Sequence, residues 1–128
     1  MSNVTLVSPD DQLLINKFAR FFQQQSTLKA EIKELENEIA NLGEAGDEIL
    51  LLDDEDSRSV PLRIGSSFIH FDSDSLGTRL ETMKGKAEVT LSEKKAKCEE
   101  ITEEMGRIRT ILYGKFGDKI NLETDRDD

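Results

Sequence analysis

Apolar residues recur along this chain in steps of four and three, in two runs separated by a segment of different character. Such a repeat places a narrow apolar stripe on one side of a helix, which is stable in water only when another helix covers it. Two runs of matched length therefore predict two helices that pair with each other, in antiparallel fashion. The first run is Leu14, Phe18, Phe21, Gln25, Leu28, Ile32, Leu35, Ile39, Leu42, Gly46 and Ile49, and the second is Leu76, Leu80, Met83, Ala87, Leu91, Lys94, Cys98, Ile101, Met105, Ile108 and Leu112.

Signals for helix ends bracket both runs. Ser8 is a suitable N-cap, and Pro9 fits the first helical position, followed by two aspartates that favour the positive end of the helix dipole. We expect the first helix over about 9–50. Residues 73–75 (Ser-Asp-Ser) offer caps for a second helix over about 74–116, which ends near Gly117.

The segment 60–71, VPLRIGSSFIHF, has the alternation and central glycine of a β-hairpin. A lone two-stranded hairpin is marginal in water, so its edges and apolar side chains need a cover. We expect other subunits to supply that cover; the alternative is that the hairpin folds back on its own helices. The residues expected in subunit assembly are Val60, Leu62, Ile64, Gly65, Phe68, Ile69 and Phe71.

These elements predict a mostly α fold, an antiparallel two-helix coiled-coil hairpin with one β-hairpin at its bend. The 128 residues are expected to form one unit, 1–128, with an acidic tail over 117–128. A two-helix hairpin buries one stripe per helix, so its stability should depend on neighbouring subunits.

The net negative charge of the chain excludes some classes of binding partner. The formal net charge of −10 argues against nucleic acid and against anionic membranes, because both need a basic surface. Residues 44–56 hold seven acidic residues and no Lys or Arg. This run is interpreted as a solvated loop, with a docking patch for a basic partner as the alternative. One cysteine and no apolar run of membrane-spanning length favour a cytoplasmic protein.

The sequence offers no constellation for catalysis. His70 is the single histidine, and it has no cysteine or histidine cluster around it that would bind zinc. Cys98 lies on the predicted stripe and is expected to be buried. We therefore expect neither an enzyme nor a bound cofactor or metal.

Apolar residues beyond the stripe gather at the two chain ends, which the hairpin should bring together away from the β element. They either bind a partner or cap the end of the coiled coil, and the pattern leaves both open. These residues include Val4, Leu6, Val7, Ile111, Phe116 and Ile120.

Three stretches carry a resemblance to a known family: DDQLLINKFAR at 10–20, LLLDDEDS followed by VPLRIGSSFIHF, and LYGKFGDKINLE at 112–123. Together they resemble the prefoldins, and a single hairpin between the helices is similar to the β-type subunits of that family. The resemblance implies a heterohexamer of two α-type and four β-type subunits. Their hairpins would join in a central β-barrel platform from which six coiled coils extend.

The resemblance further implies an ATP-independent holdase that captures unfolded actin and tubulin and hands them to the cytosolic group II chaperonin. In that family the distal coiled-coil ends hold the substrate, which corresponds here to residues 4–7, Leu13, Ile111, Phe116 and Ile120. The rival hypothesis is a structural or tethering coiled coil without chaperone activity.

Overall fold

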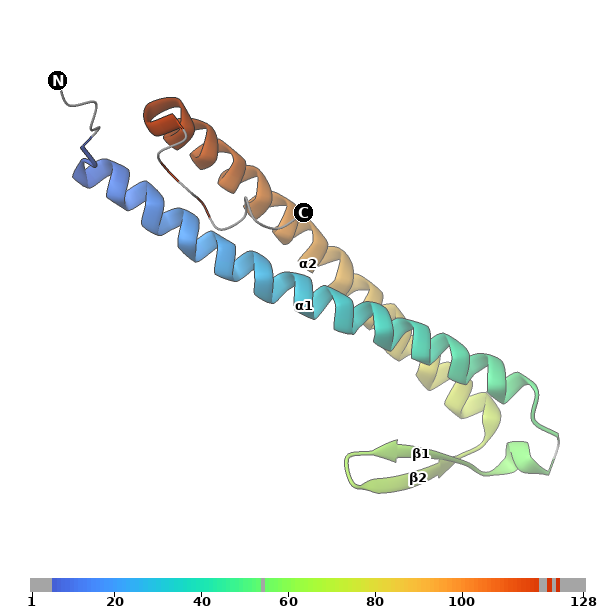
Figure 1. Ribbon diagram of the computed structural model, residues 1–128. Coiled ribbons are helices and arrows are strands. Elements are labelled where there is room, and N and C mark those ends of the chain that lie inside the picture. Colours follow the sequence, from blue (N-terminus) through green and yellow to red (C-terminus); the bar gives the residue numbers. More distant parts are fainter. Residues whose placement is uncertain (1–5, 54, 118–119, 121, 123–128) are drawn as a thin grey trace. The chain divides into compact units, whose positions relative to one another are not determined.

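The computed structural model describes residues 6–53, 55–117, 120 and 122 (Figure 1). Two long helices and an antiparallel β-hairpin between them confirm the mostly α fold class. The elements in chain order are α1 (Pro9–Leu50), a short 3-10 turn η1 (Asp56–Arg58), β1 (Val60–Ile64), β2 (Ser67–Phe71) and α2 (Ser73–Phe116).

The start of α1 is fixed by reciprocal hydrogen bonds between Ser8 and Asp11. The Asp11 backbone N–H donates to Ser8 Oγ at 3.1 Å, and the Ser8 N–H donates to Asp11 Oδ2 at 2.9 Å. This is a capping box, which satisfies two backbone donors that the first helical turn leaves unpaired. Ser8 is therefore the cap that the sequence predicts.

The cap of α2 is Asp72 and not one of the three residues expected for it. Asp72 Oδ1 accepts the backbone N–H of Ser75 at 2.7 Å, and Asp72 Oδ2 accepts the Ser75 hydroxyl at 3.1 Å. The Ser75 backbone hydrogen bond is the main cause that lowers the pKa of Asp72. At the other end Gly117 has φ +59°, a left-handed conformation that glycine adopts readily as it ends a helix.

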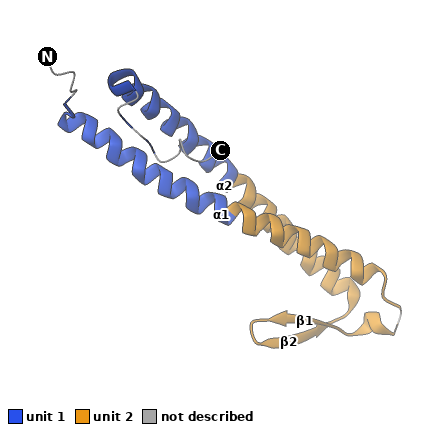
Figure 2. Cartoon of the chain, in the orientation of Figure 1, with its two compact units in different colours: residues 1–31, 94–128 blue, residues 32–93 orange. Residues whose placement is uncertain are grey.

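The chain divides into two compact units, coloured separately in Figure 2. Unit 1 comprises residues 1–31 and 94–128, and unit 2 comprises residues 32–93. Each unit contains a segment of α1 and a segment of α2. The expectation of one unit over 1–128 stays a prediction, and most of the tail over 117–128 lies outside the described residues.

Unit 1 has a dense apolar core built from both helix segments and from the chain that follows α2. Phe18 is the member of this core that α1 contributes. Half-buried residues of both segments, among them Leu14, Phe21 and Leu28, pack against the core. The buried members of the core are Phe18, Ile101, Met105, Ile108, Leu112, Phe116 and Leu122. All but two of these lie on the predicted stripes, so the four–three spacing correctly predicts most of this core.

Polar contacts across unit 1 fix how its helix segments are aligned. The Gln25 amide, which is buried, donates to Thr102 Oγ1 at 2.8 Å. Lys94 Nζ donates to Glu31 at 3.2 Å. Gln25 precedes Glu31 on α1, whereas its partner Thr102 follows Lys94 on α2. The two helix segments are therefore antiparallel. A buried amide that would lose its partner on a shift of the helices opposes other alignments.

Unit 2 has a thinner core. Leu76, Leu80 and Ala87 of α2 are buried, whereas the α1 stripe residues of this unit, such as Leu35 and Leu42, are half-buried. The stripe residue Met83 remains partly exposed. Unit 2 on its own therefore leaves much apolar surface in contact with water.

The hairpin of unit 2 pairs β1 with β2 in a simple antiparallel register, in which Leu62 lies opposite Ile69 and Arg63 lies opposite Phe68. The two-residue loop begins at Gly65, with φ +63°, as a tight turn of this class requires. Directly opposed residues share a face of a sheet. One face is thus Val60, Leu62, Ile64, Ser67, Ile69 and Phe71, and the other is Pro61, Arg63, Phe68 and His70.

Candidate functional site

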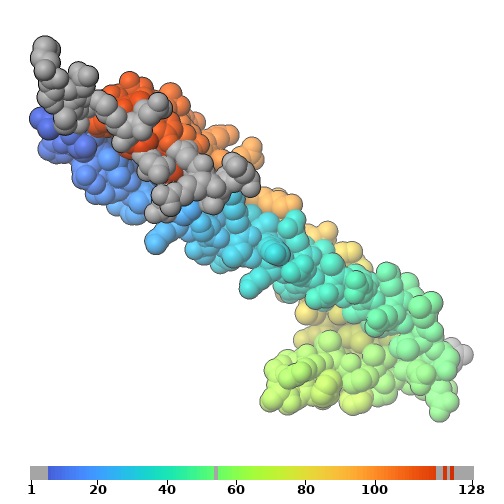
Figure 3. All heavy atoms as spheres, viewed as in Figure 1, coloured from blue at the N-terminus to red at the C-terminus, as the bar shows by residue number. Residues whose placement is uncertain are grey.

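The first candidate surface lies at the end of unit 1 where α1 begins and α2 ends (Figure 3). Leu6 and Val7 precede α1 and are exposed, and Leu13 follows in the second turn with 65% of its surface exposed. Ile111, near the end of α2, is 54% exposed. Val4 lies outside the described residues. We call Leu6, Val7, Leu13 and Ile111 the tip residues.

Phe116 and Ile120 differ from the expectation that they form exposed surface. Phe116 is only 8% exposed, and Ile120 is half-buried against the core of unit 1. Leu122 is buried as well, at 5%. Phe116 is the last residue of α2 and belongs to this core, while Ile120 and Leu122 follow the left-handed conformation at Gly117 and pack against or within it.

The expectation of end capping fits some of the apolar residues at the chain ends, and the others remain exposed. Phe116, Ile120 and Leu122 cap the helical core, while the tip residues remain uncovered. The sequence pattern alone did not separate the two sets, because both lie off the stripe. Tertiary packing decides which of them is covered.

An ion pair missed in the sequence joins the helix ends in unit 1. Lys115 Nζ lies 2.5 Å from Asp11 Oδ2, and the Asp11 side chain is nearly buried. The hydrogen bond from Lys115 is the largest cause that lowers the pKa of Asp11, followed by the hydrogen bond from the Ser8 backbone. Residues so far apart in sequence give no local signal of such a contact.

The Asp11–Lys115 ion pair should make the stability of the folded chain depend on pH. The Asp11 pKa is lower in the folded chain than its ordinary value of 3.8, so the unfolded chain binds more protons at this carboxyl. Its contribution to stability is present above the unfolded pKa and is lost as the pH falls through the lower folded pKa.

Asp11→Asn should therefore flatten the acid limb of the stability profile, measured by urea unfolding between about pH 7 and pH 3. Asp10→Asn removes a carboxylate from the same turn without removing the bridge to Lys115, and it should leave the limb steep. Equal profiles for Asp11→Asn and the unmodified protein would contradict this role of the ion pair.

The second candidate surface is the β-hairpin of unit 2. Ile64, Phe68 and Ile69 are exposed, so the described chain does not fold the outer part of the hairpin onto its own helices. Val60, Leu62 and Phe71 are half-buried near its base. There the Arg79 guanidinium of α2 lies 5.3 Å from the centre of the Phe71 ring. Both strands of the two-stranded sheet also leave an open edge.

Charge is divided very unevenly between the two units. Residues 32–93 hold fifteen Asp and Glu but six Lys and Arg, which gives unit 2 a net charge of −9. Unit 1 holds twelve acidic and eleven basic residues, a net charge of −1. Unit 1, which carries the tip residues, is thus nearly neutral overall, and the net acidity of the protein belongs to unit 2.

The His, Cys, Asp and Glu side chains of the described residues do not form a metal-binding cluster. Among them no group of three or more His, Cys, Asp and Glu side chains could hold a metal ion. His70 Nδ1 lies 3.0 Å from Ser59 Oγ on the exposed hairpin, and Cys98 is buried in unit 1, as expected. No helix in the described part of the chain is long and apolar enough to cross a membrane.

Comparison with known proteins gives a consistent result along nearly the whole chain. The family model described as "Prefoldin subunit" matches residues 12–119. A protein of Caenorhabditis briggsae named "Probable prefoldin subunit 4" is 55% identical over 98% of this chain and 99% of its own length. The Homo sapiens protein "Prefoldin subunit 4" is 36% identical over 96% of this chain and 89% of its own length.

A solved structure has the same fold. The crystal structure of the prefoldin β subunit from Thermococcus strain KS-1 superposes with a TM-score of 0.74. It covers 87% of this chain and 96% of the archaeal chain, at 17% sequence identity. At that identity the likeness shows the fold alone: two long helices joined through one β-hairpin.

Proposed function

The chain belongs to the prefoldin subunit family, and from this premise we propose that it is a β-type subunit of a cytoplasmic, ATP-independent holdase. The holdase is a heterohexamer of two α-type and four β-type subunits. It captures unfolded polypeptides, notably actin and tubulin, at the ends of its coiled coils and delivers them to the cytosolic group II chaperonin. The relatives named prefoldin subunit 4 support the subunit-4 position in this complex.

The β-hairpin is the proposed assembly element. Support comes from its exposed apolar residues Ile64, Phe68 and Ile69, from its open strand edges, and from the marginal stability of isolated hairpins in water. By joining into one barrel, the hairpins of neighbouring subunits would cover the apolar side chains and pair the open strand edges. The residues proposed for this contact are Val60, Leu62, Ile64, Gly65, Phe68, Ile69 and Phe71.

The tip residues are the proposed substrate-binding surface, and their exposure is the observation that carries the chaperone hypothesis. Unfolded chains of any sequence share one feature, which is exposed apolar side chains. A few exposed leucines and isoleucines bind such chains weakly, and several tips acting together convert weak contacts into useful avidity. Release then requires no nucleotide, because each contact is weak. Phe116 and Ile120, which are largely buried, enter this proposal as support for that surface, and Val4, which lies outside the described residues, remains part of it as an expectation.

Leu13→Ser combined with Ile111→Ser should weaken substrate capture without affecting assembly. Each change removes an exposed apolar side chain from the tip, and together they should lower the affinity for unfolded actin by about tenfold. The measurement is suppression of actin aggregation, by light scattering, with the reconstituted hexamer at increasing concentration.

Val89→Ser provides the matched control, because Val89 is also an exposed apolar residue of α2 but lies in unit 2. The proposal would be contradicted if the hexamer with both tip changes suppressed aggregation to the same extent as the Val89→Ser hexamer. The tip residues would then not be the substrate-binding surface. Failure of all hexamers, the unmodified one included, to suppress aggregation would favour the tethering coiled coil.

A further inference from the structure

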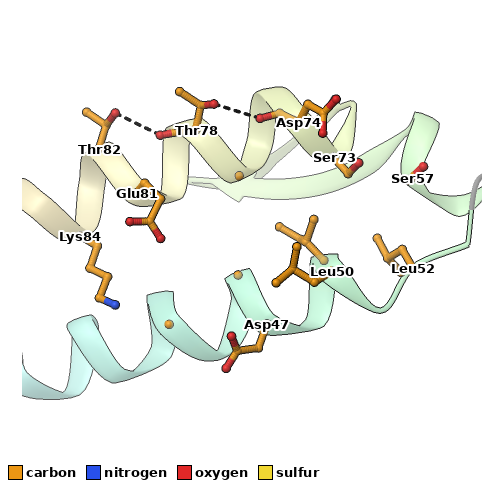
Figure 4. A pocket seen from close by; sticks show the side chains of 14 residues that line it. Asp47, Leu50, Leu52, Ser57, Ser73, Asp74, Thr78, Glu81, Thr82 and Lys84 are labelled. Carbon is orange, nitrogen blue, oxygen red and sulfur yellow. Dashed lines mark hydrogen bonds between the residues drawn. The ribbon is translucent and has the colours of Figure 1, made fainter.

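Unit 2 contains a groove between its two helix segments that neither of the surfaces described above includes (Figure 4). It has a volume of about 900 Å³, enough for several side chains of a partner. Ile49, Leu50 and Leu52 line it from the α1 side. From α2, Glu81 and Lys84 extend toward α1 in Figure 4.

Glycines form the open part of this groove. Gly43 and Gly46 of α1 and Gly77 of α2 line it, and a Cβ atom added at Gly46 or Gly77 would meet no other atom within 4 Å. Neither glycine is therefore needed for close packing of the helices against each other. Glycine inside a helix costs about 1 kcal/mol relative to alanine. The absent side chains leave backbone and apolar surface accessible from outside.

The surroundings of the groove determine which ligand fits it. Leu50 and Leu51 are 82% and 85% exposed, so apolar contacts are available directly beside the groove. Three carboxylates, Asp47, Asp74 and Glu81, line the groove against one cation, Lys84. The run 44–56 adds further acidic residues without any Lys or Arg. A ligand for this surface must combine apolar side chains with positive charge.

We propose that this groove docks a cationic segment with apolar side chains from a separate folded protein. A second copy of this chain does not fit, because it would bring another unit of charge −9 against the first. The groove is lined by helix and loop residues and by none from β1 or β2. None of the residues proposed for assembly lines the groove, so hairpin assembly and groove binding use different residues of this chain.

The test uses the reconstituted hexamer and a fluorescein-labelled amphipathic peptide composed of leucine and lysine. Fluorescence anisotropy should detect binding that weakens with added salt, as expected for a charge-assisted contact. Gly77→Leu places a side chain in the groove and should raise the Kd of the peptide about tenfold. Gly46→Leu, on the opposite helix, should have the same effect and serves if Gly77→Leu fails to assemble.

Gly85→Leu is the matched control, since Gly85 lies on α2 in unit 2, has open space around it and does not line the groove. It should leave the Kd unchanged, as should the double change Leu13→Ser and Ile111→Ser at the tip. A Kd sensitive only to the tip changes would place the peptide on the substrate surface and overturn the groove proposal while leaving the chaperone proposal intact. A Kd insensitive to all four variants, or no binding by the assembled hexamer, would also overturn it.

Discussion

A chain carrying Ile64→Asp and Ile69→Asp is expected to fold its helices yet fail to enter the hexamer. Both side chains lie on the apolar face of the hairpin and are exposed in the isolated chain, so the carboxylates remain hydrated there. In a barrel of joined hairpins the same carboxylates would be buried without partners, at a cost of several kcal/mol. That cost corresponds to a loss of more than about a hundredfold in assembly affinity. Size-exclusion chromatography with the partner subunits measures the loss.

Two further variants test the rest of the hairpin. Ser66→Asp adds the same charge in the loop and should assemble normally. Phe68→Asp adds it on the opposite face, beside Arg63, and should also block assembly, because Phe68 is one of the residues proposed for the subunit contact. A normal hexamer formed by the Ile64→Asp, Ile69→Asp chain would exclude this apolar face from the subunit interface.

Leu112→Ala should produce the largest loss of local stability in unit 1. Leu112 is completely buried in the core that joins the ends of α1 and α2. Replacing it leaves a cavity among well-packed neighbours, and such changes cost about 3 kcal/mol. Amide hydrogen exchange of residues 101–116 in the assembled hexamer should accordingly accelerate by about a hundredfold.

The neighbouring residue gives a matched comparison. Ile111→Ala removes an equally large side chain from the same helical turn, but Ile111 is half exposed, and the cost should stay below about 1 kcal/mol. Equal acceleration of exchange in both variants would mean that the core of unit 1 does not depend on the burial of Leu112. Substrate capture should show the opposite order, with Ile111 the more sensitive position.

The two compact units differ in chemistry as well as in packing. Unit 1 combines a dense core and the exposed tip residues with almost no net charge, whereas unit 2 combines a thin core, an exposed hairpin face and a charge of −9. Apolar contact should therefore dominate at the tip. At unit 2, charge should select among apolar ligands, which would distinguish the proposed docking surface from the proposed substrate surface.

The sequence by itself determined the secondary structure, the stripe and most of the core. The four–three spacing indicates which face of each helix is covered, and the start signal at Ser8 and the turn at Gly65 act over a few residues. These features depend on neighbours within one turn or one strand, so a linear pattern contains them. Asp72 was missed as a cap for a local reason too: three other suitable caps follow it directly.

Only the tertiary structure decided which residues off the stripe are buried and which are exposed. Leu13 and Phe116 look alike in the sequence, yet Leu13 is exposed and Phe116 is buried in the core of unit 1. The bond between Gln25 and Thr102 and the ion pair of Asp11 join residues from opposite ends of the chain. The helical period predicts that the two stripes face each other, but the burial and charge pairing of single side chains off the stripe depend on tertiary contacts that the period does not contain.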